Sequence, residues 1–144
     1  MNLIIRCLLF GLFFIALTSN AQVNAPITML GKVTNAIPGT VAVPVMVQNC
    51  YQVGAISLTF QYDNSVLSYL DFSANAAFNA SGTDLFVDGT TSGTVVISWT
   101  DWSNNNPVSL ANGSTMVNIN FTYKKTIADY SALTFDITTT GACE

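Results

Sequence analysis

Residues 55–65 read AISLTFQYDNS, and apolar side chains occupy every second position from Ile56 to Tyr62. Successive side chains of a β-strand point to opposite faces, so this period of two predicts a strand with one buried and one polar face. The Asp-Asn-Ser at 63–65 consists of turn-forming residues, which favour a reversal of the chain. The stretch therefore predicts a strand, a turn and a second strand.

The same alternation recurs along most of the chain, and no helical periodicity of useful length interrupts it. Residues 75–83 are mostly small and polar, which indicates a loop that could contain a short helical turn. Phe78 is the only residue of this loop expected to contribute to the core. Pro44 cannot donate to a ladder, so its strand is expected at a sheet edge or beside a bulge. Strands are expected at residues 27–33, 40–47, 56–62, 66–72, 85–87, 95–100, 116–123 and 133–138.

About eight short strands separated by turn signals indicate an all-β fold, and a two-sheet sandwich is favoured over a barrel. The 144 residues suffice for one such domain, and no repeat or linker divides them. The chain ends at Gly141-Ala-Cys-Glu144 without a final apolar strand to pair with the first. We therefore expect either a C-terminally truncated domain or an open last edge.

The first 21 residues have the features of a signal peptide. One positive side chain, Arg6, precedes an apolar run from Cys7 to Leu17, and the small residues Ser19 and Ala21 follow. The apolar run is too short for a helix that crosses a bilayer, which takes about 20 residues. We expect export and cleavage, no stable membrane insertion afterwards, and a mature domain of residues 22–144 that is secreted, extracellular or at the cell surface.

The composition excludes several kinds of function. The chain contains no His, which excludes Ser-His-Asp and Cys-His catalytic sites and His-ligated metals. Only 8% of the residues are charged and the net charge is −4, so the basic surface needed for nucleic acid is missing. No pair of carboxylates can be singled out for glycoside hydrolysis. We expect neither an enzyme nor a cofactor.

The acidic residues are better explained by structure than by metal binding. Asp63 opens a predicted turn, where its carboxylate would bond its own backbone. The segments that begin at Asp88 and Asp101 lack the spacing and terminal Glu of a self-contained calcium loop. No metal site is expected.

Two cysteines follow the signal segment, Cys50 and Cys143. An even number of cysteines in an oxidising compartment favours pairing, and both residues are expected at strand ends. The sequence therefore predicts a Cys50–Cys143 disulfide.

Three blocks of the chain carry a family resemblance: PGTVAVPV at 38–45, VGAISLTFQYDNSVL at 53–67 and LANGSTMVNINF at 110–121. The first two together resemble the opening of a cohesin domain, and the third resembles the turn and strand near the family's C-terminal third. The resemblance implies a nine-stranded jelly-roll sandwich whose flat face binds a dockerin module, assembling polysaccharide-degrading enzymes on a scaffold. A nine-strand pattern leaves this chain one strand short.

The resemblance also places the partner surface. In cellulosomal cohesins the strand that leads into the Tyr-Asp pair carries polar and acidic dockerin contacts, and here the matching outward positions hold no acid. With the neighbouring predicted strand they form a low-charge face, which is the expected site for a dockerin-like protein module. Its residues are Ala55, Ser57, Thr59, Gln61, Val96, Ser98 and Thr100.

Two other functions stay open. The fold is also similar to a group of carbohydrate-binding modules, and sugar rings stack on exposed aromatic faces. Trp99 alternates with core residues and is expected to be buried, whereas Tyr51 and Trp102 lie in polar loops and are the candidates for binding polysaccharide. The alternative for both residues is that they cap the ends of the sandwich. A purely structural adhesin domain is the third hypothesis.

The signal-peptide hypothesis predicts that the mature protein begins at Gln22, because Ser19 and Ala21 satisfy the small-residue rule of signal peptidase. N-terminal sequencing of secreted material measures this directly. An intact Met1 on the secreted protein would contradict it.

Overall fold

Strands form where apolar residues alternate with polar ones. The computed structural model describes residues 25–79, 84–102, 106–124 and 130–136. Within them the elements are β1 (Ile27–Leu30), β2 (Gly39–Gln48), β3 (Ala55–Gln61), β4 (Leu67–Ala74), α2 (Ala76–Asn79), β5 (Phe86–Asp88), β6 (Thr94–Thr100), β7 (Ser114–Tyr123) and β8 (Thr134–Phe135). The predicted strand positions and the short helical turn are confirmed, with differences at some ends.

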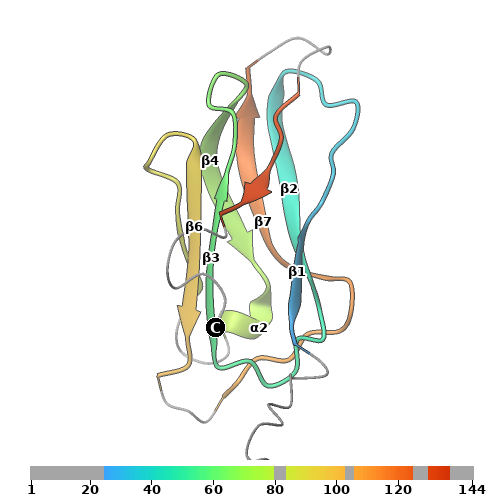
Figure 1. The fold of residues 1–144 in the computed structure, drawn as a ribbon, viewed down its shortest axis with the longest axis vertical. Coiled ribbons are helices and arrows are strands. Elements are labelled where there is room, and N and C mark those ends of the chain that lie inside the picture. The colour runs from blue at the N-terminus through green and yellow to red at the C-terminus, as the bar shows by residue number, and fades with distance from the viewer. Residues whose placement is uncertain (1–24, 80–83, 103–105, 125–129, 137–144) are drawn as a thin grey trace, which may run out of the picture.

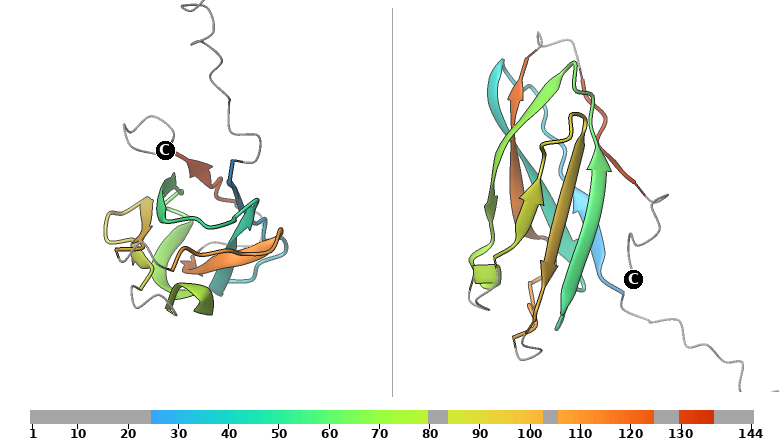
Figure 2. Two further views of the ribbon diagram at one scale, coloured as in Figure 1. Left: turned by 90° about the horizontal axis from the view of Figure 1, so that it is seen from below. Right: turned by 90° about the vertical axis from the view of Figure 1, so that its left-hand side faces the viewer.

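The strands form two antiparallel sheets that face each other (Figures 1 and 2). One sheet has the order β1-β2-β7-β4, and the other has the order β5-β6-β3-β8. Most connections cross from one sheet to the other, so strands that follow each other in sequence are seldom neighbours. The predicted all-β, two-sheet sandwich is therefore confirmed.

Pro44 explains why β1 is shorter than the predicted 27–33. The β1–β2 register ends at Leu30 opposite Val45, and the N–H of Gly31 donates to the Pro44 carbonyl at 2.7 Å. The return bond of this pair would need an N–H on Pro44, which proline lacks. The β1–β2 ladder therefore stops at this pair.

At the other end of the chain, β8 is shorter than the predicted 133–138. Residues 137–138 of that prediction lie outside the described part.

Both expectations for Pro44 hold. Strand β2 lies between β1 and β7, but its register with β1 ends at Val45, so Pro44 stands where the β1 side of β2 becomes an edge. The β2–β7 register shifts between Val45 and Met46, directly after the proline. Proline is tolerated here because its missing N–H faces the β1 side of the strand, where the ladder ends.

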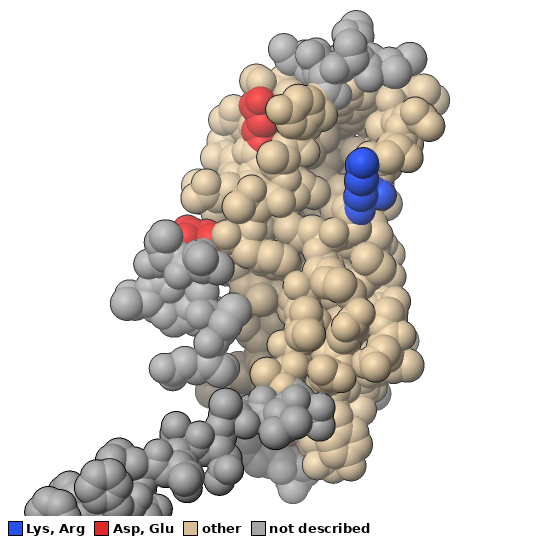
Figure 3. All heavy atoms as spheres, turned by 45° about the vertical axis from the view of Figure 1, so that its right-hand side comes forward, with Lys and Arg blue, Asp and Glu red and all other residues tan. Residues whose placement is uncertain are grey.

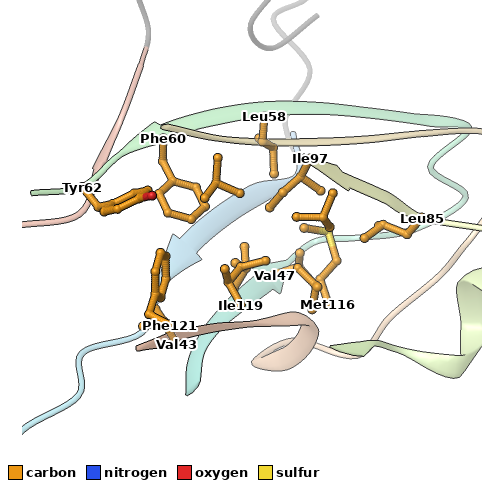
Figure 4. Packing of buried hydrophobic residues seen from close by; sticks show 14 of the residues in the cluster. Val43, Val47, Leu58, Phe60, Tyr62, Leu85, Ile97, Met116, Ile119 and Phe121 are labelled. Carbon is orange, nitrogen blue, oxygen red and sulfur yellow. The ribbon is translucent and has the colours of Figure 1, made fainter. Parts of the chain in front are cut away.

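The inward side chains of the two sheets form one apolar core, and Figure 4 shows Leu58, Phe60 and Ile97 on one side of it facing Ile119 and Phe121 on the other. Aromatic rings meet edge to face across the layer. Tyr62 lies 5.0 Å from Phe121 between ring centroids, and such pairs stabilise beyond their buried area by about 0.5–1.5 kcal/mol. The core thus confirms the inward faces that the alternation predicts.

Helix α2 closes one end of this core. Its Phe78 is fully buried and meets the ring of Trp99, also buried, at a centroid distance of 5.4 Å. Phe78 is the side chain that the sequence singled out in this loop, and the predicted burial of Trp99 is confirmed. None of the described helical segments is long and apolar enough to span a membrane.

Cys50 follows β2 and is buried, and it forms no disulfide with any residue in the described ranges. Burial raises the pKa of its thiol, an effect that a backbone hydrogen bond from Leu110 partly opposes. Cys143 lies outside the described residues, so its pairing with Cys50 stays a prediction.

If that disulfide forms, the exported protein contains no free thiol even after it is unfolded. Titration must be done in denaturant without reductant, because a buried Cys50 would escape reagents in the native state. Closing a loop of this length stabilises by about 4–5 kcal/mol in the chain-entropy model. Two thiols in the unfolded, unreduced protein would contradict the pairing.

Two glycines offer a matched test of the packing between β4 and the β5–β6 loop. A Cβ at Gly89 would lie 2.2 Å from the Tyr69 ring, whereas a Cβ at Gly54 meets nothing within 4 Å. We expect Gly89→Ala to lower the free energy of unfolding by about 1–3 kcal/mol through overpacking. Gly54→Ala should stay within about 0.5 kcal/mol of the parent. Urea denaturation measures both, and equal effects would refute this account.

Candidate functional site

The seven residues predicted to contact a partner lie together on the outward side of β3 and β6, and we call this surface the β3/β6 face. Antiparallel pairing sets Ala55 opposite Thr100, Ser57 opposite Ser98 and Thr59 opposite Val96, with Gln61 at the end of the β3 row. Their neighbours in sequence point into the core, so the whole set must point outward. Ala55, Ser57, Gln61 and Thr100 are exposed, and Thr59, Val96 and Ser98 are half-buried.

Strand β5 extends this surface with two residues that the sequence analysis did not select. Phe86 pairs with Ser98, and Asp88 pairs with Val96, so both continue rows of the β3/β6 face. The Phe86 side chain is 59% exposed although it is large and apolar. The signal was present in the sequence, because Leu85 and Val87 on either side are core residues and Phe86 must then face outward.

On the opposite flank, Thr134 of β8 pairs with Gln61, and the N–H of Asp136 donates to the Thr59 carbonyl at 2.8 Å. The four strands therefore form one continuous surface centred on β3 and β6. No Lys or Arg occurs within these strands, and Figure 3 shows how sparse charged side chains are on the adjoining side of the molecule. Ser, Thr and Gln provide the hydrogen-bonding groups.

Asp88 is a charged group at the β5 rim of this surface. Its carboxylate accepts hydrogen bonds from the Thr90 hydroxyl at 2.7 Å and from the Thr90 N–H at 2.8 Å. These bonds favour the ionised form and hold the pKa of Asp88 below its ordinary value. The rim is thus negative at Asp88 over the physiological pH range.

Tyr51 and Trp102 are 74% and 81% exposed, so the expectation that they cap the sandwich is wrong. Their segments are fixed at the same end of the sandwich: the Asp101 N–H donates to the Gly54 carbonyl at 2.8 Å, and Val53 forms a bridge with Val108. The ring of Phe78 packs on Trp99 in the core, whereas the rings of Tyr51 and Trp102 lie in solvent.

The carboxylates predicted to be structural bond to backbone. Asp63 accepts from the Ser65 N–H at 2.8 Å, as expected for a residue that opens a turn, and buried Asp101 accepts from the Asn106 N–H at 2.9 Å. Among the described residues, no three His, Cys, Asp or Glu side chains gather closely enough to hold a metal ion.

A groove of about 570 Å³ opens on the other side of the molecule, between the chain after β1 and the chain before β8. Its walls are mainly apolar, with contributions from Leu30, Val41, Tyr123 and Leu133. Among the described residues that line it, Lys32 is the charged one, and none of them carries a carboxylate or a thiol. The described part of the lining therefore offers no pair of carboxylates for general acid–base chemistry.

A two-sheet antiparallel sandwich with a continuous, nearly uncharged strand face defines the class of this protein as a β-sandwich module. The cohesin domain model matches residues 28–142, and the chain belongs to the cohesin family. The sequence resemblance to cohesins is thereby confirmed. No curated protein matches the chain in sequence.

Solved structures agree with this assignment. CaCohA2 from Clostridium acetobutylicum is 28% identical with a TM-score of 0.65, and the match covers 79% of this chain and 76% of that one. A complex of CaCohA2 with a point variant of CaDoc0917 matches at 24% identity and a TM-score of 0.67, covering 80% and 84% of the two chains. The sixth cohesin of Acetivibrio cellulolyticus scaffoldin B, solved with a Cel5 dockerin, has 16% identity and a TM-score of 0.66, covering 78% and 82%.

Proposed function

We propose that this protein is an exported, non-catalytic module that binds a dockerin-bearing protein through the β3/β6 face. The observation that carries the proposal is the continuity of that face over four strands, with its hydroxyl and amide groups exposed or half-buried. Two of the similar cohesin structures contain a dockerin, which supports the choice of partner.

The chemistry of the face suits a protein partner. Ser57, Ser98 and Thr100 can donate and accept hydrogen bonds, and burying a hydroxyl costs less than burying an ion. Small side chains keep the surface flat, so a partner can approach the strands closely. Protein interfaces are likewise depleted of charge at their centre and polar at their rim.

Absence of catalysis and location outside the cell are parts of the same proposal. The chain has no His, and the described residues that line the groove include no carboxylate. Residues 1–21 carry the pattern of a signal peptide and lie outside the described residues. A module secreted or held at the cell surface would then act as a receptor for enzymes that degrade polysaccharides.

A second candidate function, polysaccharide binding, is favoured by one observation: Tyr51 and Trp102 are exposed at the same end of the sandwich. Aromatic rings in solvent offer apolar faces on which sugar rings stack. Retention of the wild-type protein on insoluble cellulose, and its loss in Tyr51→Ala, would support this function.

Adding negative charge to the β3/β6 face should abolish docking. In the double variant Ala55→Asp/Ser57→Asp both carboxylates replace exposed side chains, so the fold should persist. In the complex they would be buried without partners, a cost of about 3–5 kcal/mol, which weakens binding at least a hundredfold. Isothermal titration against a panel of dockerin modules that includes CaDoc0917 measures the effect.

The matched control is Thr40→Asp/Ala42→Asp on β2. Both residues are exposed on the outer side of the opposite sheet, and the added charge is the same. This variant should bind like the wild type. Equal losses in the two variants would show that net charge, and not the β3/β6 face, controls binding, and a wild-type protein that binds no dockerin would refute the function itself.

A further inference from the structure

We propose that Phe86 and Trp102 are the two aromatic anchors of the docking surface, one beside the middle of β6 and one beyond its end. The inference rests on the proposed docking function and deepens it, because it identifies the residues that supply binding energy and the chemistry that the partner must present. Neither residue belongs to the set that the alternation of β3 and β6 selects.

Phe86 lies on the outward side of the sheet by strand geometry. Its neighbour Val87 is buried and pairs with buried Ile97, whereas Phe86 pairs with Ser98, which faces outward. The row across the sheet thus runs from Ser57 through Ser98 to Phe86. A phenyl ring in solvent at the end of a row of serines contributes nothing to the core, but it can be buried by a partner.

The outward direction of Trp102 follows from the geometry at the end of β6. The β3–β6 ladder continues past Thr100, because the Asp101 N–H donates to the Gly54 carbonyl at 2.8 Å. Trp99 and Asp101 are buried and Thr100 is exposed, so the alternation directs the next side chain outward. Trp102 is 81% exposed, in agreement with that direction.

The two anchors lie on either side of Thr100 along β6. Four residue steps along a strand separate the Ser98 row from Trp102, which corresponds to about 13 Å. Between them lies Thr100, with Ala55 beside it on β3. A partner that covers this length must present two apolar patches about 13 Å apart along the strand, with a hydrogen-bonding group between them, and a helix spans this distance in about nine residues.

Energetics favours the aromatic residues as the dominant contacts. Exposed Ser and Thr exchange hydrogen bonds with water for hydrogen bonds with a partner, so their net contribution is small. Aromatic side chains bury far more area, and binding energy at interfaces concentrates in a few such residues, surrounded by polar contacts that exclude water. On this surface the described residues of that kind are Phe86 and Trp102.

The experiment compares Phe86→Ala and Trp102→Ala with Tyr130→Ala by titration against the dockerin that binds the wild-type protein best in the panel. Tyr130 is 84% exposed and lies at the groove, away from the β3/β6 face. We expect each anchor variant to weaken binding roughly tenfold or more and the control to leave it unchanged. Phe86→Leu and Trp102→Phe should restore most of the affinity.

Thermal unfolding of each variant confirms that the fold persists, as expected for side chains in solvent. Wild-type binding with no loss in either alanine variant would overturn the anchors but leave the docking function intact. Unchanged dockerin affinity in Trp102→Ala, combined with lost retention on insoluble cellulose, would overturn the proposal by assigning Trp102 to glycan binding. A wild-type protein that binds no dockerin in the panel would overturn the docking function and the anchors together.

Discussion

Phe121 packs edge-on against Tyr62, and this contact joins the two sheets of the sandwich. Phe121 belongs to β7, which lies between β2 and β4, and Tyr62 directly follows β3 in the other sheet. Every strand must present its apolar side chains to the layer between the sheets, since this burial is the main favourable contribution to folding. The core therefore determines which residues of β3 and β6 face outward. Because alternate side chains pack into the apolar layer, the remaining ones must face solvent.

Three acidic residues stabilise the connections between the strands. Asp63, Asp88 and Asp101 each accept backbone N–H groups in turns or loops. Unpaired backbone donors near a core are costly, so these carboxylates stabilise the connections between strands. What remains for the surface is Ser, Thr, Asn and Gln. A module built in this way presents a nearly neutral face, which a partner can cover without removing many ions from water.

The two functional hypotheses occupy neighbouring parts of the molecule. The β3/β6 face covers the middle of one sheet, and Trp102 lies just beyond the last residue of β6. Docking and polysaccharide binding therefore compete for Trp102 but not for Ser57 or Tyr51. The groove near Lys32, on another side of the sandwich, belongs to neither surface.

The sequence by itself determined the strand positions, the turn at Asp63, the outward set on β3 and β6 and the family, because each depends on local alternation or on a short contiguous motif. Tertiary structure decided what depends on pairing between distant segments. Pro44 ends the β1 ladder only because Gly31 lies opposite it. Phe86 joins the face only because β5 pairs with β6. Trp102 faces solvent because the Asp101–Gly54 hydrogen bond continues the ladder, and hence the alternation, past the end of β6.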